Sequence, residues 1–439
     1  MMEVMSLPPG PAIPPLLQTL RWVARPIEFM EQARRTYGEA FSVRFSGFKA
    51  PMVMVSDPDL VKTVYSNPAN SLPEGRISLL EPVLGSKSVI LLDGEEHLAR
   101  RKLMLPAFHG ERMRSYQDVM KEAIDREIES WPIGEAFPIH PRMQAVTLEV
   151  ILRTVFGVDG GARLDRLRVL LGKTLEDTAA PGWQVLNLFT RRFGGPAGPP
   201  GFTDGLRQVD SELAGLIAEL RRGHHREDVG PVLERRVAAE FADGGRMDEA
   251  ELRDQLMTLL VAGHETTATA LAWTFDLVLR DPRVLSRLKS ELDEGGDEYL
   301  RATITEALRL RPVIPIAGRI LDGPVEFDGF SLEAGANVAP SIWMANTRSD
   351  SFPDPFAFKP ERFLEDPPET YAWIPFGGGV RRCLGAAFAE FEMRVVLTEV
   401  LTRCDLRLVD KEPQRIGRRN ITLSPRDRTP VVMAARRLA

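Results

Sequence analysis

The sequence has few cysteines for its length. Only Cys383 and Cys404 occur among 439 residues, and no CxxC pair is present. Two cysteines exclude a disulfide framework of the kind that holds small secreted proteins together, and the missing CxxC argues against a structural zinc site made of thiolates. Because unpaired cysteines suit a reducing compartment, the sequence predicts a cytoplasmic protein.

The sequence also lacks an excess of positive charge and a long apolar run. Lys and Arg number 56 and Asp and Glu number 62, which gives a net charge of −6 and does not favour nucleic-acid binding. The best candidate for a membrane span, 256–273, carries His264 and Glu265 in its middle. The N-terminal residues lack the charged and apolar regions of a signal peptide. We therefore predict no membrane span and no nucleic-acid partner.

Helical patterns dominate, and strand signals are short. Apolar spacing, capping residues and Pro or Gly boundaries predict helices at about 26–37, 57–66, 94–105, 111–130, 142–156, 162–179, 204–222, 248–280, 283–294 and 297–310. Strand signals occur at 41–45, 51–56, 325–330, 336–340 and within 405–435. No repeat or composition break marks a linker. The sequence therefore predicts one domain, 1–439, that is mainly α with a small β-rich part.

Cys383 lies in the segment FGGGVRRCLG, residues 376–385. Glycines let a backbone approach a flat or bulky group, because no Cβ intervenes. The residues after the cysteine predict a helix, whose N-terminal dipole, together with Arg381 and Arg382, favours a thiolate. Such a thiolate can act as a nucleophile, a redox sensor or a metal ligand, whereas most lone cysteines are buried and inert. A nucleophile needs a His base, and none of the six histidines has a local signature that ties it to Cys383.

A single thiolate ligand is typical of haem iron, where it promotes cleavage of the O–O bond. An enzyme of this kind needs small residues, a hydroxyl and an acid over the other haem face. The segment AGHETT, 262–267, in the long predicted helix has all three. Ala262 and Gly263 leave room for a cofactor. Thr266 is expected to hydrogen-bond back to the carbonyl of residue 262, and Glu265, an acid in an apolar helix, is a candidate proton relay.

These two segments resemble those of the cytochrome P450 family, and the resemblance runs from about residue 8 to the C-terminus. The cysteine segment fits the family pattern FxxGxRxCxG, and the helix segment fits [AG]Gx[DE]T[TS]. ExxR follows in the family's order at Glu306 and Arg309, and PERF supplies Arg362. A Glu and an Arg at i, i+3 are common on helices, so it is the four motifs together that carry the resemblance.

The resemblance implies a fold, a cofactor and its ligands. The fold is that of the cytochromes P450, with haem b held between the long distal helix, about 248–280, and the helix after the cysteine loop. Cys383 would be the iron ligand, and Glu265 and Thr266 would deliver protons. The other residues that the resemblance places at the haem are His97, Arg101, Arg319, Arg381, Phe376, Gly377, Ala262 and Gly385.

The resemblance also implies a structural network and a substrate pocket. Glu306, Arg309 and Arg362 would form a buried network that supports the haem-binding core. The positions that line the pocket in the family correspond to Ile77, Leu79, Thr258, Val261, Ala262, Val313, Ile314, Ile316 and Ile421. This mainly apolar lining implies a hydrophobic substrate such as a terpenoid, a fatty acid, a steroid or a polyketide.

The implied activity is insertion of one oxygen atom from O2 into that substrate. The acid–threonine pair favours O2 over peroxide as the oxygen source. The sequence has neither a GxGxxG dinucleotide fingerprint nor the length for a fused flavin domain, so electrons are expected from a separate ferredoxin or flavodoxin with its reductase. Cations that would meet an acidic carrier are Arg100, Lys102, Arg112, Arg114, Arg382 and Arg394. A thiolate-haem sensor without turnover and a cysteine-nucleophile enzyme without haem stay open as alternatives.

Overall fold

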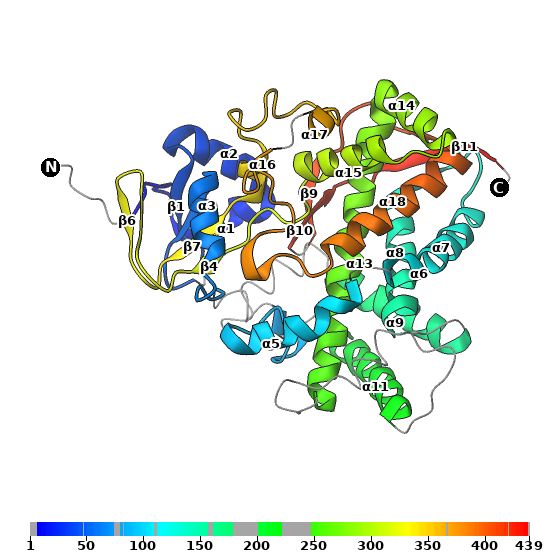
Figure 1. Cartoon of the computed structure of the whole chain (residues 1–439), viewed down its shortest axis with the longest axis horizontal. Helices are drawn as coiled ribbons and strands as arrows, with labels where there is room; N and C mark the ends of the chain where they lie inside the picture. Colours follow the sequence, from blue (N-terminus) through cyan, green and yellow to red (C-terminus); the bar gives the residue numbers. More distant parts are fainter. Residues whose placement is uncertain are drawn as a thin grey trace. The chain divides into compact units, whose positions relative to one another are not determined.

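The computed structural model describes residues 7–46, 48–73, 80–81, 83–108, 112–156, 161–178, 201–221, 247–365, 368–419 and 421–437. Among these residues the chain is mainly helical, with four small sheets (Figure 1). The chain divides into two compact units. Unit 1 comprises Met1–Ile77, Ala272–Ala386 and Asp410–Thr429, and unit 2 comprises Ser78–Leu271, Ala387–Val409 and Pro430–Ala439.

The strands of unit 1 form one four-stranded sheet and two hairpins. The order of the sheet is β1 (Ala40–Val43), β2 (Met52–Val55), β7 (Asn337–Pro340) and β4 (Arg319–Ile320). β1 and β2 are antiparallel, whereas β2 pairs in parallel with β7. The hairpins are β5 (Val325–Phe327) with β6 (Phe330–Leu332), and β9 (Ile416–Arg419) with β10 (Thr422–Pro425). Segments far apart in the sequence therefore meet in one sheet.

The helices of unit 1 have clear local start signals. They are α1 (Pro15–Ala24), α2 (Pro26–Tyr37), α3 (Pro58–Ser66), α14 (Pro282–Asp293), α15 (Glu298–Leu310), α16 (Ile342–Asn346) and α17 (Arg362–Glu365). Proline opens α1, α2, α3 and α14, where its missing N–H costs no helical hydrogen bond. Asp57 and Asp281 cap α3 and α14 by accepting backbone N–H groups of the first turn.

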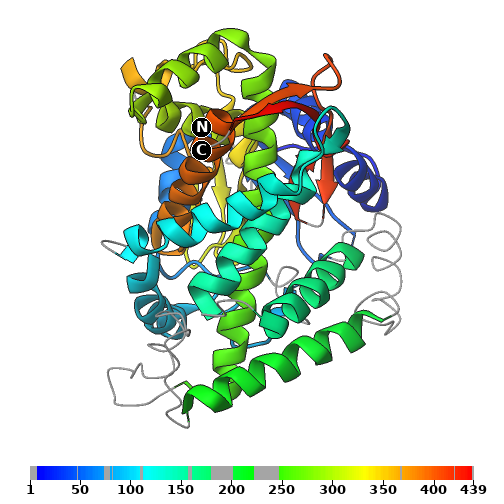
Figure 2. The same ribbon diagram turned by 90° about the vertical axis from the view of Figure 1, so that its right-hand side faces the viewer.

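Unit 2 is built from helices that pack in succession. They are α5 (Gly94–Met104), α6 (Arg112–Ser115), α7 (Gln117–Glu129), α8 (Ile139–Phe156), α9 (Gly161–Thr178) and α11 (Phe202–Arg221). α7 packs on α8, α8 on α9, and α9 on α11 (Figure 2). A three-stranded sheet has the order β3 (Ala136–Pro138), β11 (Pro430–Arg436) and β8 (Cys404–Leu408).

Two long helices continue from one unit into the other. α13 spans Glu249–Arg280, and α18 spans Ala386–Arg403. α13 is buried over most of its length, as the apolar circumference of the predicted helix 248–280 requires. Its start is capped as expected, because the Glu251 backbone N–H donates to Asp248 Oδ1 at 2.7 Å. No helix among the described residues is long and apolar enough to cross a bilayer.

The predicted helices are confirmed, with three differences. The predicted helix 111–130 is two helices, α6 and α7, interrupted at Tyr116. The predicted strand 325–330 is a tight hairpin, because Asp328 and Gly329 adopt φ values of 46° and 77°, which reverse the chain. The helices α1, α16 and α17 were not predicted, since α1 lies in a proline-rich segment and the other two are very short.

Candidate active site

Cys383 lies in unit 1 at the end of the glycine-rich loop 376–385. Its backbone N–H donates to the Phe376 carbonyl at 2.8 Å, which closes the loop, and α18 begins three residues later. The Cys383 side chain is exposed, whereas Cys404 is buried and burial raises the pKa of the Cys404 thiol to about 11. Cys383 is therefore the thiol that can bind a group outside the packed core.

Two of the loop's four glycines allow close packing against Tyr65. A Cβ on Gly378 would lie 2.5 Å from the Tyr65 ring, and one on Gly379 would lie 1.8 Å from the Tyr65 carbonyl oxygen. A Cβ on Gly377 or on Gly385 would meet no heavy atom within 4 Å. Open space beside the loop therefore lies at Gly377 and Gly385, while the other two glycines let the loop rest directly on α3.

We expect Gly379→Ala to destabilise unit 1 far more than Gly377→Ala. Both glycines have positive φ, 63° and 66°, which costs an alanine about 1–2 kcal/mol. Only Gly379 would also force a Cβ into a backbone carbonyl, so its variant should lose about 3 kcal/mol or more of unfolding free energy. Denaturant unfolding of the two variants measures the difference, and equal losses would contradict the packing role of Gly379.

Cations flank the cysteine loop in unit 1. Arg319 on β4 is 5% exposed, donates to the Gly318 carbonyl at 2.9 Å and lies 5.0 Å from the Tyr65 ring centroid. Arg381 is half-buried in the loop itself. Phe376 packs edge-on against Trp373, with 6.1 Å between ring centroids. In unit 2, His97 is buried and Arg101, one turn later on α5, is half-buried.

The AGHETT segment lies in the part of α13 that belongs to unit 2. Ala262 is exposed and Val261 and Thr266 are half-buried, although most of the neighbouring residues of this helix are buried. The Thr266 hydroxyl donates to the Ala262 carbonyl at 2.6 Å, which confirms the expected back-bond. The Ala262 methyl group and the Thr266 hydroxyl thus lie in one partly exposed segment of a helix that is otherwise mostly buried.

Gly263 lies close to α8. A Cβ at this position would lie 2.7 Å from Ile151 Cδ1 on α8. A side chain at this position would therefore require the end of the Ile151 side chain to move, whereas Ala262 is exposed. His264 is also an interior residue: its ring Nδ1 lies 3.1 Å from Thr147 Oγ1 on α8, and it is 3% exposed. The HET sequence is not a surface turn.

Glu265 points toward α8. Gln144 Nε2 donates to its Oε2 at 2.6 Å, and Thr269 Oγ1 and His140 Nε2 lie 3.5 and 3.8 Å from its Oε1. Sequence reasoning did not identify these three partners. The signal was His140 and Gln144, two polar residues one turn apart at the start of an apolar helix.

The structure brings Glu306, Arg309 and Arg362 together in unit 1. Arg309 donates to both Glu306 oxygens at 2.6 and 2.8 Å, and Arg362 Nε lies 3.2 Å from Oε1. The Glu306 and Arg309 side chains are fully buried. Arg309 also donates to the carbonyls of Asn346 and Pro355, so its charge is surrounded by acceptors. This buried network joins α15 to α17 through Arg362 and to the segment before α17 through the Pro355 carbonyl.

A family model described as cytochrome P450 matches residues 8–429. The chain belongs to the cytochrome P450 family. The chain is therefore an oxidoreductase. Membership of this family implies a haem bound by a cysteine thiolate and the use of O2 and a redox partner.

Two relatives from Mycobacterium tuberculosis span nearly the whole P450. Cytochrome P450 135B1 is 37% identical over 436 residues, covering 96% of this chain and 90% of the relative. Cytochrome P450 138 is 37% identical over 442 residues, covering 99% and 97%. Neither name states a substrate.

Two solved structures match the fold at lower identity. Retinoic-acid-bound cyanobacterial CYP120A1 has a TM-score of 0.83 and 23% identity, covering 99% of this chain and 100% of that one. The cytochrome P450DA heme domain has a TM-score of 0.85 and 22% identity, covering 99% and 98%. At this identity the likeness concerns the fold, which is that of the cytochromes P450.

The residues of the P450 fit the haem that the family implies. In unit 1 an exposed thiol lies in a loop with open space at Gly377 and Gly385, next to the cations Arg319 and Arg381. In unit 2 an exposed alanine lies on the long helix, and α5 carries a His and an Arg one turn apart. Within unit 1 alone, the exposed thiol, the open space and the arginines suit a flat, anionic, iron-bearing cofactor.

The residues predicted to line the substrate pocket differ in burial. Thr258 is buried, and its hydroxyl donates to the Asp254 carbonyl and lies 2.6 Å from Ser88 Oγ. Val313 is also buried. Val261, Ile314, Ile316 and Ile421 are half-buried, and Ile77 and Leu79 lie outside the described residues. Thr258 is therefore engaged in packing, and its hydroxyl faces Ser88.

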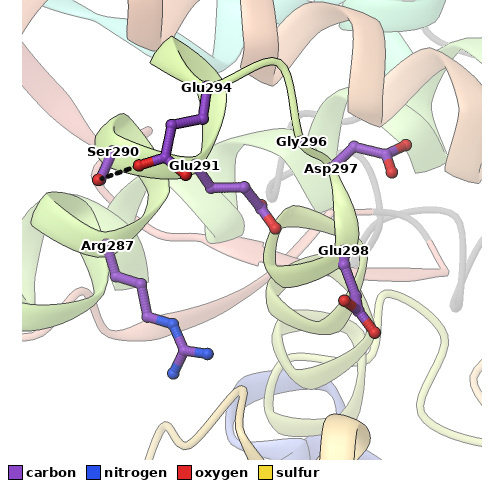
Figure 3. A pocket seen from close by; sticks show the side chains of 7 residues that line it. All are labelled: Arg287, Ser290, Glu291, Glu294, Gly296, Asp297 and Glu298. Carbon is purple, nitrogen blue, oxygen red and sulfur yellow. Dashed lines mark hydrogen bonds between the residues drawn. The ribbon is translucent and has the colours of Figure 1, made fainter.

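A cavity of about 600 Å³ in unit 1 lies beside α14 and α15 (Figure 3). Its lining is polar and mostly acidic: Arg287, Ser290, Glu291, Glu294, Gly296, Asp297 and Glu298. Glu291 accepts the backbone N–H groups of Tyr299 and Leu300, so it caps the start of α15. No motif residue lines this cavity, and its chemistry does not suit an apolar substrate.

One cation expected to meet a redox partner has a structural contact instead. Arg100 Nε lies 2.7 Å from the Glu251 Oε1 on α13, and the Glu251 side chain is only 5% exposed. Lys102, Arg114 and Arg382 are exposed, while Arg394 is half-buried, with its guanidinium 5.3 Å from the Phe391 ring centroid. The side chain of Arg112 lies outside the described residues. Arg100 is thus committed to the packing of α5 on α13.

Proposed function

We propose that this P450 is a monooxygenase that inserts one oxygen atom from O2 into a hydrophobic small molecule. Its electrons would come from a separate ferredoxin or flavodoxin with its reductase. The observation that carries the proposal is the Thr266 hydroxyl, held 2.6 Å from the Ala262 carbonyl next to Glu265. Peroxide brings two protons of its own, whereas O2 must be supplied with protons, so an acid beside a hydroxyl favours O2 as the oxygen source.

Each half of the site has its own proposed role. Cys383 would hold the haem iron through Sγ, and Phe376 would pack beside the sulfur. When bound, the haem supplies O2 binding and cleavage. The carboxylates of the haem would be bound by the cations His97, Arg101, Arg319 and Arg381. Gly377, Gly385 and Ala262 would border its faces, because none of them places a side chain larger than a methyl there.

Glu265 and Thr266 would move protons. A carboxyl group can take up a proton and release it, and a hydroxyl can pass it on by accepting one hydrogen bond while donating another. In the structure the single hydroxyl hydrogen of Thr266 goes to the Ala262 carbonyl, so its oxygen is oriented to accept a hydrogen bond. Passing a proton on would require this hydrogen to turn away from the carbonyl. The structural network of Glu306, Arg309 and Arg362 would take no part in the chemistry.

Thr266→Val should uncouple electron use from product formation. The variant keeps a β-branched side chain on α13 but removes the hydroxyl, so protons arrive more slowly and hydrogen peroxide leaves instead. We expect product formed per NADH consumed to fall about tenfold or more. Thr266→Ser, which keeps the hydroxyl, is the matched control. Unchanged coupling in the valine variant would refute the relay.

The proposed substrate is a terpenoid, a fatty acid, a steroid or a polyketide. The support is the apolar character of Val261, Ile314, Ile316 and Ile421, all of which are half-buried. Ile314 and Ile316 also pack against core residues of unit 1. Retinoic acid, which is bound in the solved structure of cyanobacterial CYP120A1, joins lauric acid and progesterone in the first test panel. A shift of the haem absorption on titration identifies a binder, and measurement of turnover products then identifies a substrate.

The first test of the cofactor is the spectrum of the reduced protein under carbon monoxide. A strongly red-shifted main band supports thiolate ligation by Cys383. A band typical of His-ligated haem, or folded protein that retains no haem, would overturn the proposal and favour the nucleophile alternative. The cytoplasmic location and the single domain over 1–439 stay predictions.

A further inference from the structure

Both oxygens of the Glu265 carboxylate have side-chain neighbours within unit 2. Gln144 Nε2 donates to Oε2 at 2.6 Å. On the other side, Thr269 Oγ1 lies 3.5 Å from Oε1, and His140 Nε2 lies 3.2 Å from Thr269 Oγ1. His140 and Gln144 are one turn apart on α8, and Glu265 and Thr269 are one turn apart on α13. The four side chains therefore form one polar cluster across two helices.

The cluster lies in an apolar interface. His140 is 1% exposed and Thr269 is fully buried, while the Glu265 side chain is 17% exposed. Around them α8 buries Met143, Val146, Val150 and Ile151. Polar side chains in such surroundings are costly unless they pair, and a charged hydrogen bond there is stronger than in water. Hydrogen-bond donors on α8 therefore strongly restrict the orientation of the Glu265 carboxylate.

The protonation of His140 can affect Glu265 through the hydroxyl of Thr269, which contacts both side chains. A threonine hydroxyl has one hydrogen to donate. If His140 Nε2 carries a hydrogen, it donates to Thr269, whose own hydrogen is then directed at Glu265 Oε1. If Nε2 carries none, the Thr269 hydrogen goes to the ring, and Oε1 loses that donor. The hydrogen on His140 Nε2 thus decides whether Thr269 donates to Glu265 Oε1.

We propose that Gln144, Thr269 and His140 are positioning residues for the Glu265 carboxylate. Gln144 holds Oε2 in place, and Thr269, which is oriented by His140, holds Oε1. The carboxylate of Glu265, the residue before Thr266, therefore keeps one orientation. The proposal rests on the proposed monooxygenase function, in which Glu265 carries protons. Without these donors the carboxylate turns away from its working orientation, and protons are delivered more slowly.

The test compares Gln144→Leu and Thr269→Val with two controls. Thr269→Ser keeps the hydroxyl and should rescue the valine variant. Thr147→Val removes polar contacts of the same α8–α13 interface, those of the Thr147 hydroxyl with His264 and with the Gln144 carbonyl, and leaves the side chains of Gln144, Thr269 and His140 unchanged. The infrared carboxylate bands of Glu265 are isolated by subtracting the spectrum of E265Q, a measurement that needs neither substrate nor turnover.

Turnover is measured in two ways with whichever of retinoic acid, lauric acid and progesterone gives the largest spectral shift. In one, O2 and NADH-derived electrons drive the reaction. In the other, hydrogen peroxide supplies oxygen, electrons and protons together, so proton delivery is bypassed. We expect Gln144→Leu and Thr269→Val to shift the Glu265 bands and to lower product per NADH about tenfold. Peroxide-driven product formation should stay within about twofold of wild type.

Three outcomes overturn the inference or separate it from the proposed function. Unshifted Glu265 bands in both variants would show that neither residue holds the carboxylate. An equal fall of O2-driven and peroxide-driven turnover, or an equal fall in Thr147→Val, would show a structural role only. A wild-type chain that forms product from peroxide but none from O2 would overturn the proposed function, and the infrared bands alone would then decide the positioning.

Discussion

Cys383→Ser should abolish the red-shifted band of the reduced protein under carbon monoxide and lower O2-driven product formation roughly a thousandfold, about 4 kcal/mol of barrier. The serine hydroxyl is a far weaker electron donor to iron than a thiolate, and it is the thiolate that promotes O–O cleavage. The exposed position of Cys383 before α18 should leave the fold of the variant intact.

Cys404→Ser is the matched control for this prediction. Cys404 opens β8 and is buried, and its raised pKa keeps it a neutral thiol at pH 7. Its variant should keep the wild-type spectrum and activity, with a small loss of stability from placing a hydroxyl in the core. A red-shifted band that survives in Cys383→Ser and disappears in Cys404→Ser would reverse the assignment.

Glu306→Gln should lower the free energy of unfolding by about 3–5 kcal/mol. The change leaves the Arg309 guanidinium fully buried without its carboxylate, and Arg362, which is 12% exposed, loses the same partner. Carbonyl acceptors around Arg309 remain, but they do not neutralise its charge. Denaturant unfolding, followed together with the haem content of the purified protein, measures the effect.

Glu361→Gln is the comparison for Glu306→Gln. Glu361 also bonds with two arginines, Arg283 and Arg287, and with the Tyr299 hydroxyl at 2.9 Å. Its side chain is 24% exposed and both arginines are about half exposed, so water compensates for the loss. We expect a cost of about 1 kcal/mol or less. Similar losses in the two variants would contradict the argument from burial.

Local sequence patterns were sufficient to predict most helices of this P450. Proline starts, aspartate caps and apolar spacing act within a few residues, so α2, α3 and α14 begin where the sequence predicts. The hairpin at β5 and β6 was predicted as a single strand, although its turn residues, Asp328 and Gly329, favour a two-residue hairpin turn. Aspartate adopts positive φ several-fold more often than most residues other than glycine, so this local signal was present in the sequence.

The sequence motifs identified the main candidate site residues because they too depend on local structure. Cys383, the AGHETT segment and ExxR have fixed spacings because each forms a local structure: a closed loop, a back-bonded helix turn and an i, i+3 pair. The Thr266 back-bond to Ala262 is one turn of helix and follows from the sequence alone. The burial of Glu306 and Arg309 does not, since it depends on the segment around Arg362 folding over them.

Contacts between distant segments were decided by packing. Gly263 lies beside the end of the Ile151 side chain, and Arg100 pairs with Glu251. Gln144 meets Glu265 across 121 positions of sequence. Spacing along a chain reports only neighbours within a few turns, whereas the partner of a buried charge or the neighbour of a glycine is set by which helix faces meet in three dimensions.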